Sequence, residues 1–278
     1  MPELPEVETI VRELRPHLTG QTLSHPRLYH TDVLRRVSRE RLLRTLRNNR
    51  IADVSRRAKH IVIELGTSER LVIQPRMTGS LVVYERRLSA DERRYAVLQV
   101  RLGTGTQLVF RDVRRLGTIW LLSPSAWERY TRRIGPEPLA AGFSAARFAA
   151  QLRPSRQAIK KVLMDQQRLA GVGNIYANEA LFRARIDPSR PADRLSDAEY
   201  RRLFRTVRAV LREAIAADGT TVRDYRTGTG KTGSYQFVLR VYGREGQPCT
   251  RCRTALLTTH SIDGRATTFC WRCQGKDA

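Results

Sequence analysis

The four cysteines of the chain have a spacing that is typical of a metal site. Two residues separate Cys249 from Cys252, two separate Cys270 from Cys273, and seventeen lie between the pairs. Thiolates at this spacing come from two tight turns and can close a tetrahedral shell around one Zn²⁺ ion, which leaves no position open for catalysis. We therefore predict one structural zinc ion. Redox-active thiols and disulfides are the alternatives, and a reducing compartment disfavours disulfides.

The segment between the two cysteine pairs suits a small basic β-hairpin. Its threonines and Phe269 favour short strands. The arginines in and beside it are Arg251, Arg253, Arg265 and Arg272. A positively charged finger of this kind can bind the phosphates of DNA.

The whole chain carries a strong excess of positive charge. It contains 51 Lys and Arg residues against 27 Asp and Glu, which gives a formal net charge of +24. The basic residues are spread along the chain and are not gathered in one tail, so the charge belongs to folded surfaces. A polyanion is therefore the expected partner, and a nucleic acid fits best. A ribosomal or architectural protein would show the same balance, so charge alone does not indicate an enzyme.

The opening residues, MPELPEVETI, lack the pattern of an export signal. No basic start precedes an apolar run there, and no stretch of the chain approaches the roughly twenty apolar residues of a membrane span. We expect a soluble, cytoplasmic monomer.

Two types of periodicity divide the chain into the parts that must position these residues. Apolar residues at helical spacing within residues 5–14 predict a short helix almost at the N-terminus. Between residues 51 and 122 the pattern changes to short β-branched runs separated by glycine and charged turns, which indicates an antiparallel sandwich or barrel. The runs are 61–65, 71–73, 81–84, 97–102, 107–110 and 118–122.

A helical part follows the β-rich part. Residues 135–142 contain two prolines and two alanines that break the β pattern, and we place a domain boundary there. Ser155 is expected to cap a helix that ends near Gly171, and further helices are expected over residues 175–185 and 197–217. Residues 220–234 hold three glycines and few apolar side chains, which predicts a long mobile loop of the kind that often forms a lid.

Four separate motifs together resemble the formamidopyrimidine-DNA glycosylase family. They are the opening Pro2-Glu3-Leu4-Pro5-Glu6, Lys59 in a basic turn before a strand, the run GVGNIYANE at residues 171–179 between two helices, and the four-cysteine finger. They occur in the order found in the family and span nearly the whole chain. The sister endonuclease VIII group shares the architecture, but its opening usually has Gly at the position of Leu4. The purine-directed branch is therefore favoured.

The resemblance implies an α+β, multidomain fold. It predicts an N-terminal catalytic β-sandwich flanked by helices, over residues 1–135. A helix-two-turns-helix DNA-binding domain is expected over residues 136–240, with a lesion-capping loop at 220–235 whose backbone amides could bind the flipped base. A β-hairpin zinc finger is expected over residues 241–278.

The resemblance also implies that Pro2 is the nucleophile. Removal of the initiator Met, which a small second residue such as proline permits, gives a secondary amine; an ordinary α-amino group has a pKa of roughly 7.7 to 8 and so supplies some free base at neutral pH. Attack on C1′ of the damaged nucleotide would form an iminium ion, which makes the 2′ proton acidic and leads to β- and then δ-elimination. The implied activity is the excision of oxidised purines, 8-oxoguanine and formamidopyrimidines, from duplex DNA in base excision repair.

By the same resemblance, Glu3 is the candidate acid and base that moves protons as the sugar ring opens. Glu6, one helical turn further on, would support the site or contact the deoxyribose. Lys59 would hold a phosphate beside the lesion and assist catalysis. The ordinary alternative for each of these side chains is a solvated surface charge.

Further residues are expected to contact DNA. Asn174 lies where a glycine-flanked turn meets a helix, so its amide and the neighbouring N–H groups can bind phosphate oxygens. The resemblance adds Lys160, on the preceding helix, and Arg265, which stands five residues before Cys270 at the position of a phosphate-binding arginine. A plain helix connection is the alternative for the turn before Asn174.

Extrusion of a base from the duplex leaves a hole that side chains must fill. The resemblance assigns this task to Met77 on one loop and to Arg114 and Leu116 on another, with Arg114 facing the orphaned cytosine. Two positions depart from the family pattern, because Leu116 stands where Phe is common and Gln74 where many relatives have His. Leucine can act as a wedge but stacks less well on a base, so lesion search or opposite-base discrimination is expected to differ.

Two other functions stay open at this point. A non-enzymatic DNA-binding protein with a helical element and a zinc finger would have the same charge, although it would have no use for Pro2 and Glu3. An endonuclease VIII type enzyme would act on oxidised pyrimidines by the same mechanism; Arg114 and the long glycine-rich loop weigh against it.

Overall fold

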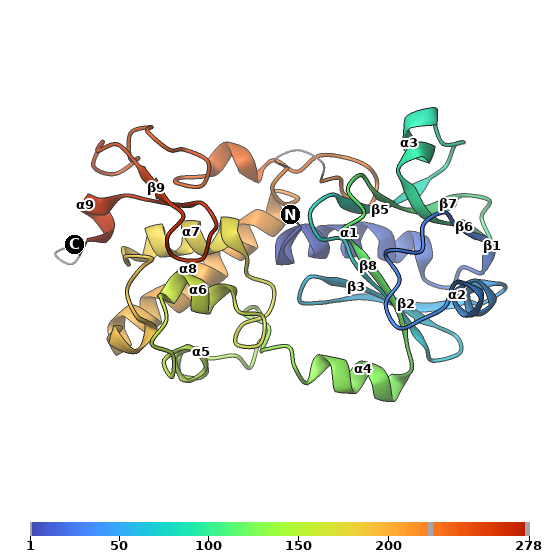
Figure 1. The fold of residues 1–278 in the computed structure, drawn as a ribbon, viewed down its shortest axis with the longest axis horizontal. Coiled ribbons are helices and arrows are strands. Elements are labelled where there is room, and N and C mark those ends of the chain that lie inside the picture. The colour runs from blue at the N-terminus through green and yellow to red at the C-terminus, as the bar shows by residue number, and fades with distance from the viewer. Residues whose placement is uncertain (1, 222–224, 276–278) are drawn as a thin grey trace. The chain divides into compact units, whose positions relative to one another are not determined.

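The chain forms two compact units (Figure 1). The computed structural model describes residues 2–221 and 225–275. The first unit consists of Met1–Arg132 and Ile215–Gln236, and the second consists of Arg133–Ala214 and Phe237–Ala278.

Helix α1 (Leu4–Leu18) opens the first unit and includes the helix expected at residues 5–14. A capping box begins it: the Glu3 side chain accepts from the backbone N–H of Glu6, and the Glu6 side chain accepts from the N–H of Glu3. Pro5 fits the first turn because the N–H that it lacks would have no helical partner there. The sequence therefore specifies the start of this helix within a few residues.

Two four-stranded sheets follow, and every pairing in them is antiparallel. The β pattern left a sandwich and a barrel open, and the structure is a sandwich. One sheet has the order β1 (Leu23–Leu28), β6 (Ala96–Leu102), β7 (Gln107–Asp112), β5 (Gly79–Tyr84). The other has the order β2 (Ile51–Arg57), β3 (His60–Leu65), β4 (Arg70–Gln74), β8 (Thr118–Leu122).

The two sheets and α1 share one apolar core of leucine, isoleucine and valine side chains around Phe110. Helix α1 packs against β2, β3 and β5. All six predicted β runs lie within these strands. Strand β1 and three short helices were not expected from the sequence, and a serine side chain caps each of these helices: α2 (Arg39–Leu46), α3 (Ala90–Arg94) and α4 (Pro124–Thr131).

Two loops cross between the sheets at the same end of the sandwich. Residues 75–78 join β4 to β5, and residues 113–117 join β7 to β8. Strand β4 pairs with β8 and β5 pairs with β7, so the ends of the loops meet: Gln74 is opposite Thr118, and Gly79 is opposite Asp112. The register of the sheets thus places the two loops side by side.

The second unit is helical and ends in a small hairpin. Its elements are α5 (Ala145–Leu152), α6 (Ile159–Met164), α7 (Asn174–Ala184), η1 (Ala192–Arg194), α8 (Asp197–Ala216), β9 (Leu257–Thr259), β10 (Thr267–Phe269) and α9 (Trp271–Gln274). The last residues of α8 belong to the first unit, and the short helix η2 (Tyr235–Val238) spans the other junction.

The helix expected from Ser155 to Gly171 is shorter than the sequence pattern suggested. Ala158 is the N-cap of α6, whereas the Ser155 hydroxyl accepts the N–H of Gln157 in a local turn. The helix ends before Asp165, whose carboxylate accepts the N–H of residue 167 and so favours a turn over further helix. Helices α7 and α8 match their predicted ranges to within one residue.

The packing groups the segments differently from the three domains expected. The described residues of 215–221 and 225–236, which belong largely to the expected capping loop, pack with the N-terminal unit, and residues 241–275 pack with the helices of the second unit. The division at 1–135, 136–240 and 241–278 stays a prediction about functional domains.

Candidate functional site

The start of α1 holds the expected nucleophile and its neighbouring carboxylate. Pro2 is buried and Glu3 is 1% exposed. The Glu3 N–H donates to Oε2 of Glu6 at 2.7 Å, so the helix fixes the direction of the backbone at residues 2 and 3. The positive end of the helix dipole favours ionised carboxylates at this place. An amine held beside a carboxylate can combine nucleophilic attack with proton transfer.

Glu6 links the start of α1 to the base of the glycine-rich loop. Its Oε1 accepts the N–H of Thr220 at 2.8 Å, whereas its Oε2 accepts the N–H of Glu3. Gly219 has a φ of +81°, and a Cβ there would lie 3.0 Å from both Cγ and Oε1 of Glu6, so glycine is needed at this position. Because only 1% of Glu6 is exposed, the geometry favours its supporting role over direct contact with a sugar.

The described part of the glycine-rich loop is held against α1. The Tyr225 hydroxyl donates to the backbone oxygen of Glu6 at 3.2 Å, and Glu13 Oε2 accepts the N–H and the hydroxyl of Thr229 at 2.8 and 2.9 Å. Burial, together with the charge of Glu6, raises the pKa of Tyr225, so the hydroxyl stays a donor at neutral pH. The expected lid is thus anchored at these points, and its residues 222–224 lie outside the described residues.

Lys59 lies in the turn between β2 and β3, as its place before a strand predicted. It is 7% exposed, and Ala58 beside it has a φ of +52°. Arg56 secures the turn, because its guanidinium donates to the carbonyl oxygen of Ala58 at 3.0 Å and to Oε2 of Glu8 at 2.7 Å. Burial by itself would raise the pKa of Glu8, but hydrogen bonds from arginines outweigh it and the pKa is lowered. This ion pair ties the Lys59 turn to α1.

The two sheet-crossing loops, residues 75–78 and 113–117, are called the wedge loops below. Met77 is 45% exposed and Leu116 is 40% exposed, as side chains that enter a duplex must be. The Arg114 guanidinium lies 3.7 Å from Sδ of Met77. The structure therefore brings Met77 and Arg114 together, and Leu116 lies two residues after Arg114 on the same loop. These are the side chains that the resemblance assigned to the hole left by an extruded base.

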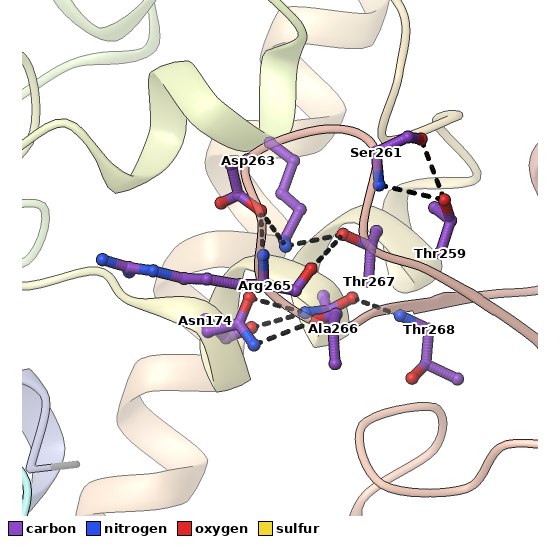
Figure 2. A network of polar contacts seen from close by, with 10 residues as sticks. Asn174, Thr259, Ser261, Asp263, Arg265, Ala266, Thr267 and Thr268 are labelled. Carbon is purple, nitrogen blue, oxygen red and sulfur yellow. Dashed lines mark hydrogen bonds and ion pairs between the residues drawn. The ribbon is translucent and has the colours of Figure 1, made fainter.

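In the second unit, Asn174 begins α7 and faces the turn between β9 and β10 (Figure 2). Its Nδ2 donates to the carbonyl oxygen of Ala266 at 3.0 Å. The preceding residue, Arg265, is exposed, and its side chain points away from this network in Figure 2. Two expected phosphate contacts from distant parts of the sequence are thus neighbours.

Lys160, which was expected to bind DNA, is fully buried under the same turn. Its Nζ donates to Oγ1 of Thr267 at 2.7 Å and to Oδ1 of Asp263 at 3.3 Å. The same Oδ1 accepts the N–H of Arg265 at 3.1 Å. The burial of Lys160 favours an effect on DNA binding through the turn that carries Arg265, and direct contact of Lys160 with a phosphate stays a prediction.

The four cysteine sulfurs form one compact cluster, all within 4.8 Å of one another. The Sγ atoms of Cys249 and Cys273 are 3.9 Å apart, those of Cys252 and Cys270 are 3.4 Å apart, and none of the four is in a disulfide. Zinc–sulfur bonds of about 2.3 Å in a tetrahedron require sulfur separations of about 3.8 Å. The cluster therefore fits one zinc ion.

Burial opposes the thiolate form at two of the four cysteines. Burial raises the pKa of Cys270, and it raises the pKa of Cys273 to about 12. Hydrogen bonds from Thr254 lower the pKa of Cys252 to about 6. Four thiolates this close together need a bound dication to offset their repulsion and their burial.

Three buried polar side chains that the sequence analysis did not single out hold the finger against α7 and the residues just after it. Glu179 accepts the backbone N–H groups of residues 240–242 at 2.9 to 3.1 Å. Asn178 Oδ1 accepts the N–H of Thr268 at 2.9 Å, and Gln274 Nε2 donates to the carbonyl oxygen of Ile186 at 2.9 Å. The sequence signal for this role was the adjacent polar pair Asn178 and Glu179 at the end of the otherwise largely apolar run at 171–179.

Comparison with known proteins identifies both parts of the chain. Residues 1–119 match the family model of the formamidopyrimidine-DNA glycosylase N-terminal domain, and residues 134–226 match that of the formamidopyrimidine-DNA glycosylase H2TH domain. The fold and the site thus define a DNA-binding repair glycosylase with a helix-two-turns-helix element.

Full-length relatives give the same result. The formamidopyrimidine-DNA glycosylases of Heliobacterium modesticaldum and Thermomicrobium roseum are 43% and 42% identical, over 99% of this chain and 100% and 99% of theirs. The crystal structure of MutM (Fpg) from Thermus thermophilus has a TM-score of 0.86 and 38% identity, with 99% of each chain covered. A Lactococcus lactis Fpg variant in complex with Fapy-dG containing DNA has a TM-score of 0.90 and 33% identity, with 99% and 100% covered. The chain belongs to the formamidopyrimidine-DNA glycosylase family.

The expectations for fold class and family are therefore confirmed, and the chain is a DNA glycosylase that acts on damaged DNA, in keeping with base excision repair. Among the described residues, no helix is both long enough and apolar enough to span a membrane.

Proposed function

We propose that this chain is a bifunctional DNA glycosylase and AP lyase that removes 8-oxoguanine and formamidopyrimidines from duplex DNA. The observation that carries the proposal is the start of α1, where Pro2 and Glu3 are buried and Glu6 accepts the N–H of Glu3. Solved relatives give support, since Lactococcus lactis Fpg has been captured with DNA that contains Fapy-dG and with DNA that contains an abasic site. The formamidopyrimidine lesion is a substrate of base excision, and the abasic site is a substrate of the lyase reaction.

The proposed chemistry begins once Met1 has been removed. The lone pair of the Pro2 nitrogen attacks C1′ of the damaged nucleotide, and the electron pair of the glycosidic bond leaves with the base, which takes up a proton. The Pro2 nitrogen loses its own proton, which balances the proton taken up by the base. The sugar ring then opens as O4′ is protonated, with Glu3 as the acid, and a tertiary iminium ion results. Loss of a 2′ proton then expels the 3′ phosphate, a second elimination expels the 5′ phosphate, and water releases the sugar remnant from Pro2.

Other residues bind and deform the DNA in this proposal. Lys59, Asn174 and Arg265 bind phosphates of the backbone, and Glu6 supports the nucleophile. Met77, Arg114 and Leu116 fill the hole left by the extruded base, with Arg114 opposite the orphaned cytosine. The loop at residues 220–235 covers the flipped base.

Zinc has a structural task only. The four cysteines would hold one ion, which cross-links the two turns of the finger and supplies no catalytic chemistry. The protein is proposed to act as a monomer on one lesion at a time.

Borohydride trapping on a duplex with 8-oxoguanine opposite cytosine tests this function. We expect a covalent adduct that peptide mapping places on Pro2. Tight binding without an adduct, despite a free Pro2, would favour a binding protein without lyase activity. A parallel duplex with an oxidised pyrimidine separates the endonuclease VIII alternative, which predicts faster trapping on that substrate.

A further inference from the structure

A single buried carboxylate, that of Asp112, lies between the two wedge loops. Asp112 is the last residue of β7 and is 1% exposed. Its Oδ1 accepts from the Thr78 hydroxyl and from the N–H of Arg114 at 3.3 Å, and its Oδ2 accepts the N–H of Gly117 at 2.6 Å. One side chain therefore binds the backbone of one wedge loop at two points and the side chain of the other loop.

The Thr78 hydroxyl completes the link. It donates to Asp112 and accepts the N–H of Arg114 at 3.0 Å, and the residue is 7% exposed. Thr78 directly follows Met77 in the chain. A shift of Met77 relative to Arg114 would therefore break hydrogen bonds of a buried carboxylate, which is costly because a buried charge depends on its hydrogen bonds.

Both wedge loops contain a backbone conformation that needs such restraint. Arg76 has a φ of +57° and Arg115 has a φ of +51°, in the left-handed region that residues with side chains disfavour. Arg76 precedes Met77, and Arg115 separates Arg114 from Leu116. Conformations of this type persist where the surroundings fix them, and they gather at functional sites.

The backbone at Gly117 lies close against the carboxylate of Asp112. A Cβ at Gly117 would lie 2.7 Å from Cζ of Phe110 and 2.9 Å from Oδ2 of Asp112. The close approach of the loop backbone to the carboxylate thus depends on glycine at this place. Asp112, Thr78 and Gly117 together support the loops that carry the exposed side chains of Met77, Arg114 and Leu116.

We propose that Asp112 and Thr78 are positioning residues that fix the two wedge loops as one preformed wedge and thereby set the discrimination of the base opposite the lesion. The inference rests on the proposed function, which assigns Met77, Arg114 and Leu116 to the hole in the duplex. A wedge that is ordered before DNA arrives loses little conformational entropy on insertion. The fixed support under the wedge loops also holds Arg114 at a set distance from the orphaned nucleobase. A nucleobase other than cytosine opposite the lesion would then leave buried polar groups unpaired.

Two substitutions of Thr78 give a matched test. Thr78→Val keeps the shape of the side chain and removes the hydroxyl, whereas Thr78→Ser keeps the hydroxyl. Single-turnover rates are measured for 8-oxoguanine opposite cytosine, for 8-oxoguanine opposite adenine, and for an abasic site in single-stranded DNA, where there is no hole to fill. We expect Thr78→Val to slow excision opposite cytosine about tenfold, because the buried Asp112 carboxylate loses one hydrogen bond and the N–H of Arg114 loses one of its two acceptors. The cytosine-to-adenine rate ratio should fall, whereas cleavage of single-stranded DNA should stay within about twofold of the parent. Thr78→Ser should restore the excision rate opposite cytosine and the cytosine-to-adenine ratio.

Other results overturn the inference. An unchanged cytosine-to-adenine ratio in folded Thr78→Val would show that the link does not position the wedge. An equal loss on duplex and single-stranded substrates would show general damage to the fold. If Thr78→Val does not fold, Asp112→Asn, which has the same shape, is measured against the same criteria.

Failure of the proposed function gives a different pattern, since the parent protein itself would then not excise 8-oxoguanine from either duplex. In that case insertion is measured directly, by the fluorescence of 2-aminopurine placed opposite an abasic-site analogue. The parent should raise the fluorescence by unstacking the base, and Thr78→Val should raise it less. An equal rise with both proteins would overturn the inference.

Discussion

At the scale of single residues, two carboxylates one helical turn apart have different surroundings and therefore different tasks. Both oxygens of Glu6 accept backbone N–H groups, one at the start of α1 and one at the base of the glycine-rich loop. A carboxylate held in this way is a poor proton carrier, because protonation would break bonds that fix two segments. Proton transfer is thus better assigned to Glu3.

Glu3→Gln tests this assignment. The amide oxygen of glutamine can still accept the helix N–H, so the free energy of unfolding should change by less than about 1 kcal/mol. The rate of base excision should fall by at least about a hundredfold, because general acid and base catalysis is lost. Single-turnover excision and thermal unfolding measure the two effects, with Glu40→Gln on α2 as a surface control. Excision at the parental rate would refute a proton-transfer role for Glu3.

Lys160→Met separates a structural from a DNA-binding role for this lysine. The substitution leaves Asp263 buried without its cation, so the free energy of unfolding should fall by roughly 3 to 5 kcal/mol. The double variant with Asp263→Asn should recover part of the loss, because the buried charge is removed as well. Chemical denaturation measures the cycle. Unchanged stability combined with weaker DNA binding would instead support direct contact.

At the scale of elements, local patterns were predictable from the sequence and register was not. The start of α1, the start of α7 and the cysteine turns depend on neighbouring residues, so caps, glycines and spacing indicate them. The contact of Met77 with Arg114 depends on the pairing of four strands, and the burial of Lys160 depends on a hairpin turn that begins a hundred residues later. Asp112 and Thr78 gave no signal, because an aspartate at a strand end is usually exposed.

The ion pair between α1 and the Lys59 turn predicts a specific pH dependence. The pKa of Glu8 lies below its ordinary value of 4.5, so the pair stabilises the folded protein above that pH and ceases to do so as the pH falls through the lowered value. Glu8→Gln should therefore reduce the free energy of unfolding at neutral pH and flatten its decline below pH 4.5. Denaturation curves between pH 7 and pH 3 measure the difference, which should shrink toward acid. A constant difference would show that the charge of Glu8 is unimportant.

Removal of zinc should affect one element and spare the chemistry. Chelation should expose the β9–β10 hairpin to hydrogen exchange, because four clustered thiols lose the ion that holds them. Lesion affinity should fall at least about tenfold as Arg265 loses its place, while cleavage of abasic single-stranded DNA should persist. Metal analysis should find one zinc per chain before treatment. Full lesion affinity after verified zinc loss would refute the role of the finger.

At the scale of the whole molecule, the net charge of +24 predicts strong binding to any duplex. Affinity alone therefore says little about individual residues. The salt dependence is more informative, because each phosphate neutralised by a cation adds about 0.9 to the slope of log K against log salt, and a neutral hydrogen-bond donor adds nothing.

Asn174 and Arg265 allow this distinction to be made with two neighbouring residues. Arg265→Ala should weaken binding on every sequence and reduce the slope by about one. Asn174→Ala should weaken binding at all salt concentrations and leave the slope unchanged, because its amide carries no charge. Fluorescence anisotropy over a range of salt concentrations measures both, with Arg205→Ala as the control, since Arg205 is an exposed arginine of α8 that is not among the expected DNA contacts. If the Asn174 variant lost slope as well, its effect would have to come from displacement of Arg265, since the two residues share the turn at Ala266.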